Sequence, residues 1–97
     1  YRMKIITVEL TGLAATLAGT RATQVTLPAQ GTYRDVLRTL AERYPDMVGI
    51  LIAPDGENFL SSNMFVINGD LATTAMVLDE TPADGEVIHL MSVITGG

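Results

Sequence analysis

The residues whose types and position most clearly suggest a chemical reaction are the last three, Thr95-Gly96-Gly97. Glycine has no Cβ, so two consecutive glycines can lie extended in a channel that is too narrow for other residues. They also leave a terminal carboxylate unhindered for attack on a nucleotide phosphate. A carboxylate is a poor acyl donor, whereas its adenylate is a good one, from which a sulfur or amine nucleophile displaces AMP. Taken alone, this ending is equally typical of a flexible chain end. Directly after an apolar strand, in a strand-helix-strand order, it favours a carrier that reacts through the carboxyl group of Gly97.

Other kinds of reactive site find little support in the sequence. The absence of cysteine excludes disulfides, thiolate nucleophiles and cysteine-based metal sites within these 97 residues. His89 is the single histidine, so a zinc site would lack ligands. No serine-hydrolase motif surrounds Ser61, Ser62 or Ser92. We therefore expect no catalytic residues, no metal and no bound cofactor, and we interpret His89 as a surface or packing residue.

Charge is distributed unevenly along the chain, whose formal net charge is −5. All six basic residues lie in the first 43 positions, and the remainder carries eight acidic residues without a lysine or arginine. Nucleic-acid binding needs basic side chains on the contact face, so we expect no nucleic-acid partner. A basic protein surface suits the acidic half, because opposite potentials steer encounter. Acidity that serves solubility alone is the alternative.

The composition predicts one folded domain over residues 1–97, because the chain is short and 47% of it is hydrophobic. No apolar run approaches the length of about 18 residues that a membrane span needs, so no membrane partner is expected. The start of the chain shows no signal-peptide pattern. Together with the absence of cysteine, this makes the cytoplasm the expected location.

The first half of the chain predicts a hairpin followed by a helix. Apolar alternation indicates strands over residues 4–10 and 21–27. Residues 12–20 between them are expected to be a connection with a short Ala/Leu-rich centre, because glycines interrupt it. A helix over residues 32–44 follows, with an N-cap at its start, one apolar face and Pro45 at its end.

The second half is harder to interpret. Residues 46–63 indicate a short turn of helix at 47–52 and a tight turn at Asp55-Gly56. A compact apolar strand over 64–67 precedes the turn pair Asn68-Gly69. A short segment near 76–78 and a last strand over 86–94 complete the chain. This order predicts an α+β fold in which one main helix covers one face of a mixed sheet.

The last strand is apolar on both of its faces. Ile88 and Leu90 fall on one face, whereas Val87, Met91 and Val93 fall on the other, with His89 among them. One interpretation is a central strand that is buried on both faces. The other is an exposed patch of Val87, His89, Met91 and Val93 that docks on a partner.

Taken together, these features resemble the ubiquitin-like β-grasp sulfur carriers (MoaD/ThiS-like), above all the small subunit of molybdopterin synthase. The resemblance covers nearly the whole chain. It rests on the opening hairpin over 4–27, the helix over 32–44, the motifs Val66-Ile67-Asn68-Gly69 and Asp84-Gly85-Glu86, and the ending Thr95-Gly96-Gly97.

The resemblance implies a β-grasp fold in which the first strand lies parallel to the last. It also implies a protein co-substrate without catalytic residues, in which Gly97 is the acyl and sulfur carrier. A ubiquitin-activating-type enzyme would adenylate Gly97 with ATP and magnesium, and the product would become a thiocarboxylate. Its sulfur would pass to a synthase large subunit or another acceptor enzyme. Gly96 and Thr95 would thread into the partner's active site, while Met91 takes the family's apolar docking position, with His89 and Val93 beside it.

Two departures leave the pathway open. Ser92-Val93 stands where the molybdopterin subunit usually carries a proline pair, and the stretch 46–63 is long. Related carriers serve thiamine, cysteine or thio-sugar synthesis, and archaeal relatives also modify lysines. The alternatives to a sulfur carrier are thus a protein modifier joined through Gly97 to lysines, and a β-grasp binding domain whose Gly-Gly ending is incidental.

Overall fold

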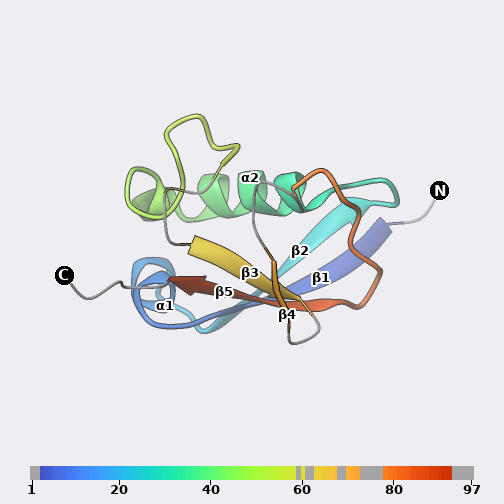
Figure 1. Ribbon diagram of the computed structural model, residues 1–97, viewed down its shortest axis with the longest axis horizontal. Coiled ribbons are helices and arrows are strands. Elements are labelled where there is room, and N and C mark those ends of the chain that lie inside the picture. Colours follow the sequence, from blue (N-terminus) through green and yellow to red (C-terminus); the bar gives the residue numbers. More distant parts are fainter. Residues whose placement is uncertain (1–2, 59, 61–62, 68–69, 73–77, 93–97) are drawn as a thin grey trace.

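The computed structural model describes residues 3–58, 60, 63–67, 70–72 and 78–92. In this part of the chain the strands and the main helix follow the predicted order, and a second, short helix is added (Figure 1). The elements are β1 Met3–Leu10, α1 Leu13–Ala18, β2 Ala22–Pro28, α2 Tyr33–Arg43, the 3-10 turn η1 Pro45–Met47, β3 Asn63–Ile67, β4 Asp70–Ala72 and β5 Val87–Ser92.

The five strands form one mixed sheet in the order β2-β1-β5-β3-β4. β1 and β2 make the predicted antiparallel hairpin, in which Ile6 is paired with Val25. β1 and β5 are parallel, with Val8 beside Ile88, which confirms the expected relation of the first and last strands. β3 runs antiparallel to both β5 and β4. The two chain segments that are most distant in sequence therefore lie side by side at the centre of the sheet.

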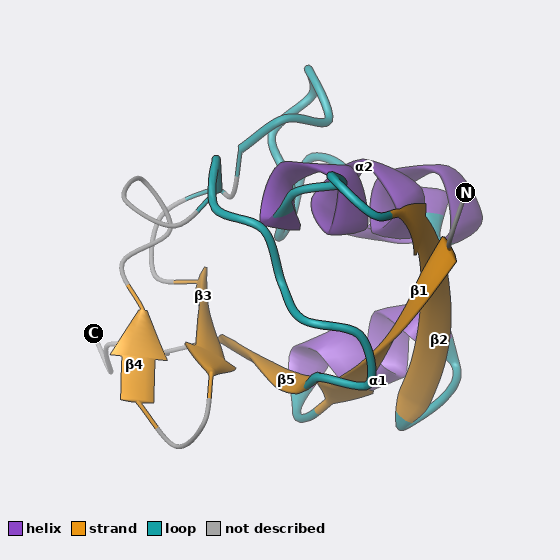
Figure 2. Ribbon diagram, turned by 90° about the vertical axis from the view of Figure 1, so that its right-hand side faces the viewer, coloured by secondary structure: helices purple, strands orange, loops and turns teal. Residues whose placement is uncertain are grey.

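A single core lies between the sheet and α2, as predicted. Alternate residues of β1 and β5 point into it, and the apolar face of α2 covers it from one side (Figure 2). Three α2 residues, Val36, Leu37 and Leu40, have no exposed surface. The main helix is thus held by tertiary packing of its apolar stripe, since eleven residues are too few to be stable alone.

The start of α2 is fixed by a capping box at Thr32 and Asp35. The backbone N–H of Thr32 donates to Asp35 Oδ2 at 2.9 Å, and the acidic side chain lies favourably at the positive end of the helix dipole. Two further N–H groups of the first turn, those of Tyr33 and Arg34, donate to the carbonyls of Glu80 and Leu78. The loop before β5 is therefore tied to the beginning of α2.

The prediction of an irregular connection over residues 12–20 is wrong for its central part, because residues 13–18 form α1. Gly12 and Gly19 are its two caps, and the N–H of Gly19, which has a positive φ of 73°, donates to Ala15 O at 2.9 Å. Glycines that predict a break can equally end a short helix. Six residues show no clear 3.6-residue period, and α1 is stabilised by burying Ala14 in the common core.

The short fourth strand lies earlier than expected. β4 pairs with β3 through Ile67 and Asp70, whereas the sequence suggested a segment near 76–78. β4 has only three residues and begins with an aspartate, so its sequence shows no alternation of apolar and polar residues that would predict a strand. Of the expected segment, residues 76 and 77 lie outside the described residues, as do Asn68 and Gly69, and Leu78 is buried in the core. The last strand spans Val87–Ser92, and the predicted positions 93 and 94 lie outside the described residues.

Within the stretch 46–63, the described residues 46–58 pack against α2. The 3-10 turn begins at Pro45, two residues before the predicted turn of helix, and Met47, Leu51 and Ile52 are buried. Arg34 Nη1 donates to Glu57 O at 2.7 Å, and Arg38 forms an ion pair with Glu57. The tight turn at Asp55-Gly56 is confirmed by the bond from Gly56 N to Ala53 O. None of the helices described here has the length and apolar character that would let it cross a membrane.

We predict that Leu40→Ala lowers the free energy of unfolding by about 2–5 kcal/mol, because it leaves a cavity under the middle of α2. The control is Glu42→Ala on the exposed side of the same helix, with an expected change within about 0.5 kcal/mol. Urea unfolding followed by circular dichroism measures both. Equal stability of the two variants would show that α2 does not cover the core.

Candidate functional site

The last strand has one buried and one exposed face. Ile88 and Leu90 have no exposed surface, whereas Val87 and Met91 are 44% and 37% exposed. The interpretation of β5 as a strand buried on both faces is therefore wrong, because α2 covers only the core side of the sheet. The side chain of His89 shares the exposed face with Val87 and Met91, as the docking-patch interpretation requires.

Neighbouring residues of β1 extend this exposed face. The side chains of Met3 and Ile5 are 53% and 46% exposed, and both alternate with core residues of β1. We call the surface formed by Met3, Ile5, Val87, His89 and Met91 the outer sheet patch. Its large apolar side chains lie on the two central strands, which is a rigid support for a binding surface.

A polar pair lies within the outer sheet patch. His89 Nδ1 is 3.0 Å from Glu9 Oε2, and the two side chains remain 42% and 47% exposed. The parallel register places Glu9 directly beside His89, although 80 positions separate them in the chain. An exposed pair of this kind contributes little stability, so its place in the patch points to recognition more than to folding. Sequence reasoning missed Glu9, which the register of the resembled fold would have located.

The predicted carrier residues Thr95, Gly96 and Gly97 lie outside the described residues, and so does Val93. The structure does place the end of the strand that precedes them. Leu90 is paired with Leu10, and Thr11 Oγ1 donates to Leu90 O at 3.5 Å. The C-terminal end of β5 therefore lies next to the end of β1 (Figure 1). Met91, at this end of β5, is on the exposed face.

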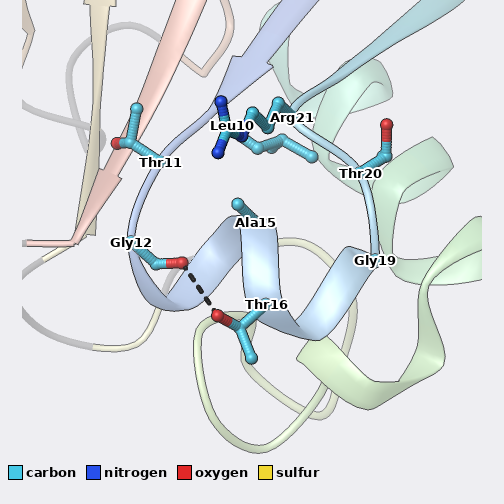
Figure 3. A pocket seen from close by; sticks show the side chains of 8 residues that line it. All are labelled: Leu10, Thr11, Gly12, Ala15, Thr16, Gly19, Thr20 and Arg21. Carbon is cyan, nitrogen blue, oxygen red and sulfur yellow. Dashed lines mark hydrogen bonds between the residues drawn. The ribbon is translucent and has the colours of Figure 1, made fainter.

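An open groove of about 630 Å³ lies beside the same edge, between α1 and the start of β2. Figure 3 shows the Arg21 side chain extending across this groove toward Thr11. The other basic side chains of the described residues have hydrogen-bond partners, but Arg21 has none within that part of the chain. Its guanidinium can therefore bind an external carboxylate or phosphate oxygen. The groove could not be located from the sequence, because α1 was not expected.

The segment before β5 is positioned by a phenol and a carboxylate. The hydroxyl of Tyr33, at the start of α2, donates to Glu86 Oε2. Burial of the Tyr33 ring raises the pKa of its hydroxyl, and the bond to Glu86 raises that pKa further. The hydroxyl is therefore a permanent donor at neutral pH. Within the described ranges, no three His, Cys, Asp or Glu side chains are arranged to hold a metal ion.

Comparison with known proteins agrees with this architecture. Residues 8–97 match the model of the ThiS family. No curated protein sequence is a significant match. SAMP1 from Haloferax volcanii, known from a crystal structure, is 26% identical with a TM-score of 0.79, covering 96% of this chain and 99% of that one.

Two further solved structures share the fold at lower identity. The small archaeal modifier protein 1 (SAMP1) from Methanosarcina acetivorans is 22% identical with a TM-score of 0.80 and full coverage of both chains. A putative molybdopterin converting factor, subunit 1, from Pyrococcus furiosus is 18% identical with a TM-score of 0.75, covering 94% and 99% of the two chains. The predicted ubiquitin-like β-grasp fold is confirmed.

The two faces of β5 predict opposite effects for the same substitution at adjacent positions. Leu90→Asp places an unpaired carboxylate in the core and should unfold the domain. Met91→Asp places it on the outer sheet patch and should leave the melting temperature within a few degrees of the parent. Thermal unfolding followed by circular dichroism compares the two. If Met91→Asp also unfolds the protein, Met91 belongs to the core and the patch is not a free surface.

Proposed function

The chain belongs to the ThiS family, and on that premise we propose that it is a ubiquitin-like sulfur carrier activated at the carboxyl group of Gly97. In this role it is a protein co-substrate and supplies no catalytic group. A ubiquitin-activating-type enzyme provides the adenylation chemistry with ATP and magnesium. A sulfur-acceptor enzyme, which the resemblance identifies as a synthase large subunit of the molybdopterin type, consumes the product.

The observation that supports the proposal is the exposure of Met91 near the C-terminal end of β5. Gly97 is the sixth residue after Met91 in the sequence. A segment of six residues reaches at most about 20 Å when fully extended. A partner that binds the outer sheet patch near Met91 therefore has the Gly97 carboxylate within reach of its own active site. Two glycines also fit a narrow channel that leads to such a site.

The chemistry requires two displacements. A carboxylate oxygen of Gly97 attacks the α-phosphorus of ATP, and pyrophosphate leaves. A sulfide nucleophile then adds to the acyl carbon, the bond from this carbon to the phosphate oxygen breaks, and AMP leaves with that electron pair. The product is a thiocarboxylate at Gly97. The carrier has to present its carboxylate and bind its partners, which needs a rigid docking surface rather than catalytic side chains.

A second candidate function is a protein modifier joined through Gly97 to lysines of other proteins. It is favoured by the 26% identity to the SAMP1 of H. volcanii, since the SAMP1 of M. acetivorans is called a small archaeal modifier protein. Both candidates share adenylation of Gly97 and differ in the final nucleophile, which is sulfide for a carrier and an amine for a modifier. A third possibility, a β-grasp binding domain, needs no adenylation at all.

Activation is expected to depend on the terminal residue. Deleting Gly97 should reduce ATP–pyrophosphate exchange by the cognate adenylating enzyme to background, because the remaining carboxylate stops one residue short of the α-phosphate. Melting temperature should not change. Glu42→Ala, an exposed change on α2, is the control and should retain exchange. Full exchange by the deletion variant would contradict activation at Gly97, whereas the absence of exchange by the parent chain would favour the binding domain.

Docking is expected to depend on the outer sheet patch. Met91→Asp should raise the KM of the adenylating enzyme for the carrier by at least about tenfold, equivalent to about 1.4 kcal/mol of binding, with little effect on kcat. Ile50→Asp is a matched control, because Ile50 is an exposed apolar side chain (51%) on the loop after η1. Steady-state exchange kinetics measure both variants. Equal KM values would exclude Met91 from the docking surface.

A further inference from the structure

The single lysine of these 97 residues is buried. Lys4 lies on the core-facing side of β1 and is only 5% exposed. Its Nζ donates three hydrogen bonds to backbone carbonyls, to Ala29 O at 2.9 Å, Gly31 O at 2.8 Å and Pro82 O at 2.8 Å. An ammonium group has three N–H donors, so its hydrogen-bonding capacity is fully used.

The three acceptors come from two loops, one between β2 and α2 and the other before β5. Ala29 follows β2, Gly31 precedes the cap of α2, and Pro82 belongs to the loop before β5. Within the described residues no carboxylate lies within 4 Å of Nζ, so carbonyl dipoles alone offset the cost of removing the charge from water. The ammonium thus joins both ends of the helical crossover to the first strand.

Gly31 is required for this arrangement. A Cβ at position 31 would lie 2.8 Å from Leu27 Cβ, which is closer than real Cβ contacts allow, and 3.1 Å from Pro28 O, which is a tight contact. The absence of a side chain lets the backbone approach Leu27 closely and bring the Gly31 carbonyl to the ammonium. Glycine at this position and lysine at position 4 are therefore parts of one structural unit.

The reactivity of a lysine matters especially in a protein that carries an activated acyl group. To accept that group, the ammonium must first lose a proton and expose a lone pair. The lone pair adds to the acyl carbon of Gly97, the bond to the phosphate oxygen breaks with departure of AMP, and the nitrogen loses a second proton. A guanidinium stays protonated and does not compete. The remaining basic residues of the chain are all arginines.

We infer that Lys4 is a structural latch and that its confinement prevents the Lys4 side chain from accepting the acyl group that this chain carries. The inference deepens the proposed function and rests on it for its biological meaning, whereas the latch rests on geometry alone. Attack by Lys4 would require the loss of three hydrogen bonds and the exit of Nζ from the interior. Neither a cyclised chain nor a chain of linked copies forms through this residue.

A groove of about 280 Å³ passes next to the latch and is lined in part by Lys4, Pro82 and Asp84. The small exposed fraction of Lys4 shows that this opening does not make the ammonium available to a macromolecule. A small acylating reagent tests the confinement of Lys4 more strictly than a macromolecule does. An exposed lysine in the same molecule provides the reference rate of labelling.

Arg21→Lys supplies that internal standard, because Arg21 is exposed and unpaired among the described residues. The native full chain is treated with the N-hydroxysuccinimide ester of biotin, and peptide mapping by mass spectrometry reports Lys4 and position 21 separately. We expect labelling of Lys4 to be at least tenfold slower in the native protein and equal in guanidinium chloride. Equal native rates would overturn the latch.

The structural role is tested by Lys4→Met, which leaves three carbonyls without their donor, those of Gly31 and Pro82 at buried positions. The midpoint of urea unfolding should fall clearly, whereas Arg21→Met, which removes an exposed cation, should leave it unchanged. A Lys4→Met variant as stable as the parent would show that the ammonium does not hold the three segments together.

The acceptor role is tested by incubating the parent chain with its adenylating enzyme and ATP without a sulfur source. We expect no Lys4 peptide linked to Gly97, and such a peptide would overturn the inference. Failure of activation itself would instead contradict the proposed function. Labelling of Lys4 would then still decide whether the latch exists, because that measurement needs no partner enzyme.

Discussion

Parallel pairing of the first strand with the last is the constraint on which the rest of the structure depends. Parallel neighbours cannot be joined by a tight turn, so the chain between them has to cross over one face of the sheet, and α2 makes that crossing. Once α2 covers one face, the other remains open, and alternate residues of β1 and β5 become the outer sheet patch. The same pairing places the C-terminal end of β5 next to Leu10 and Thr11. Met91 of the outer sheet patch therefore lies at the end of the sheet where β5 ends.

Polar contacts, in addition to the hydrophobic core, hold β1 and β5 in register. Lys4 binds the carbonyl of Pro82, the N–H of Ile5 donates to Asp84 Oδ1 at 2.9 Å, and Tyr33 binds Glu86. All three contacts act on the segment just before β5. Because a slip of one residue would exchange the two faces of a strand, these contacts determine which of its apolar side chains reach solvent. The hydrogen bonds of Lys4 and the exposure of Met91 both follow from the parallel register of β1 and β5.

Much of this could be predicted from local patterns. The hairpin, the helix at 32–44, the turn at Asp55-Gly56 and the burial of Ile88 and Leu90 follow from periodicity, capping and proline. The parallel strands came from family resemblance, because no local signal encodes a pairing between positions 8 and 88. The short helix α1 and the strand β4 are below the length at which a period is visible. Glu9 beside His89, the groove at Arg21 and the latch at Lys4 all depend on contacts between distant segments, so they required the structure.

The central claim is that the carboxyl group of Gly97 is the reactive centre and that sulfide is its final nucleophile. The most direct measurement is the intact mass of the chain after incubation with its adenylating enzyme, ATP, magnesium and a sulfide donor. The account predicts the exchange of one oxygen for sulfur, located at Gly97 by fragmentation. A chain that is adenylated but recovered as an isopeptide on lysines of other proteins, or a carboxylate that stays unmodified throughout, would contradict it.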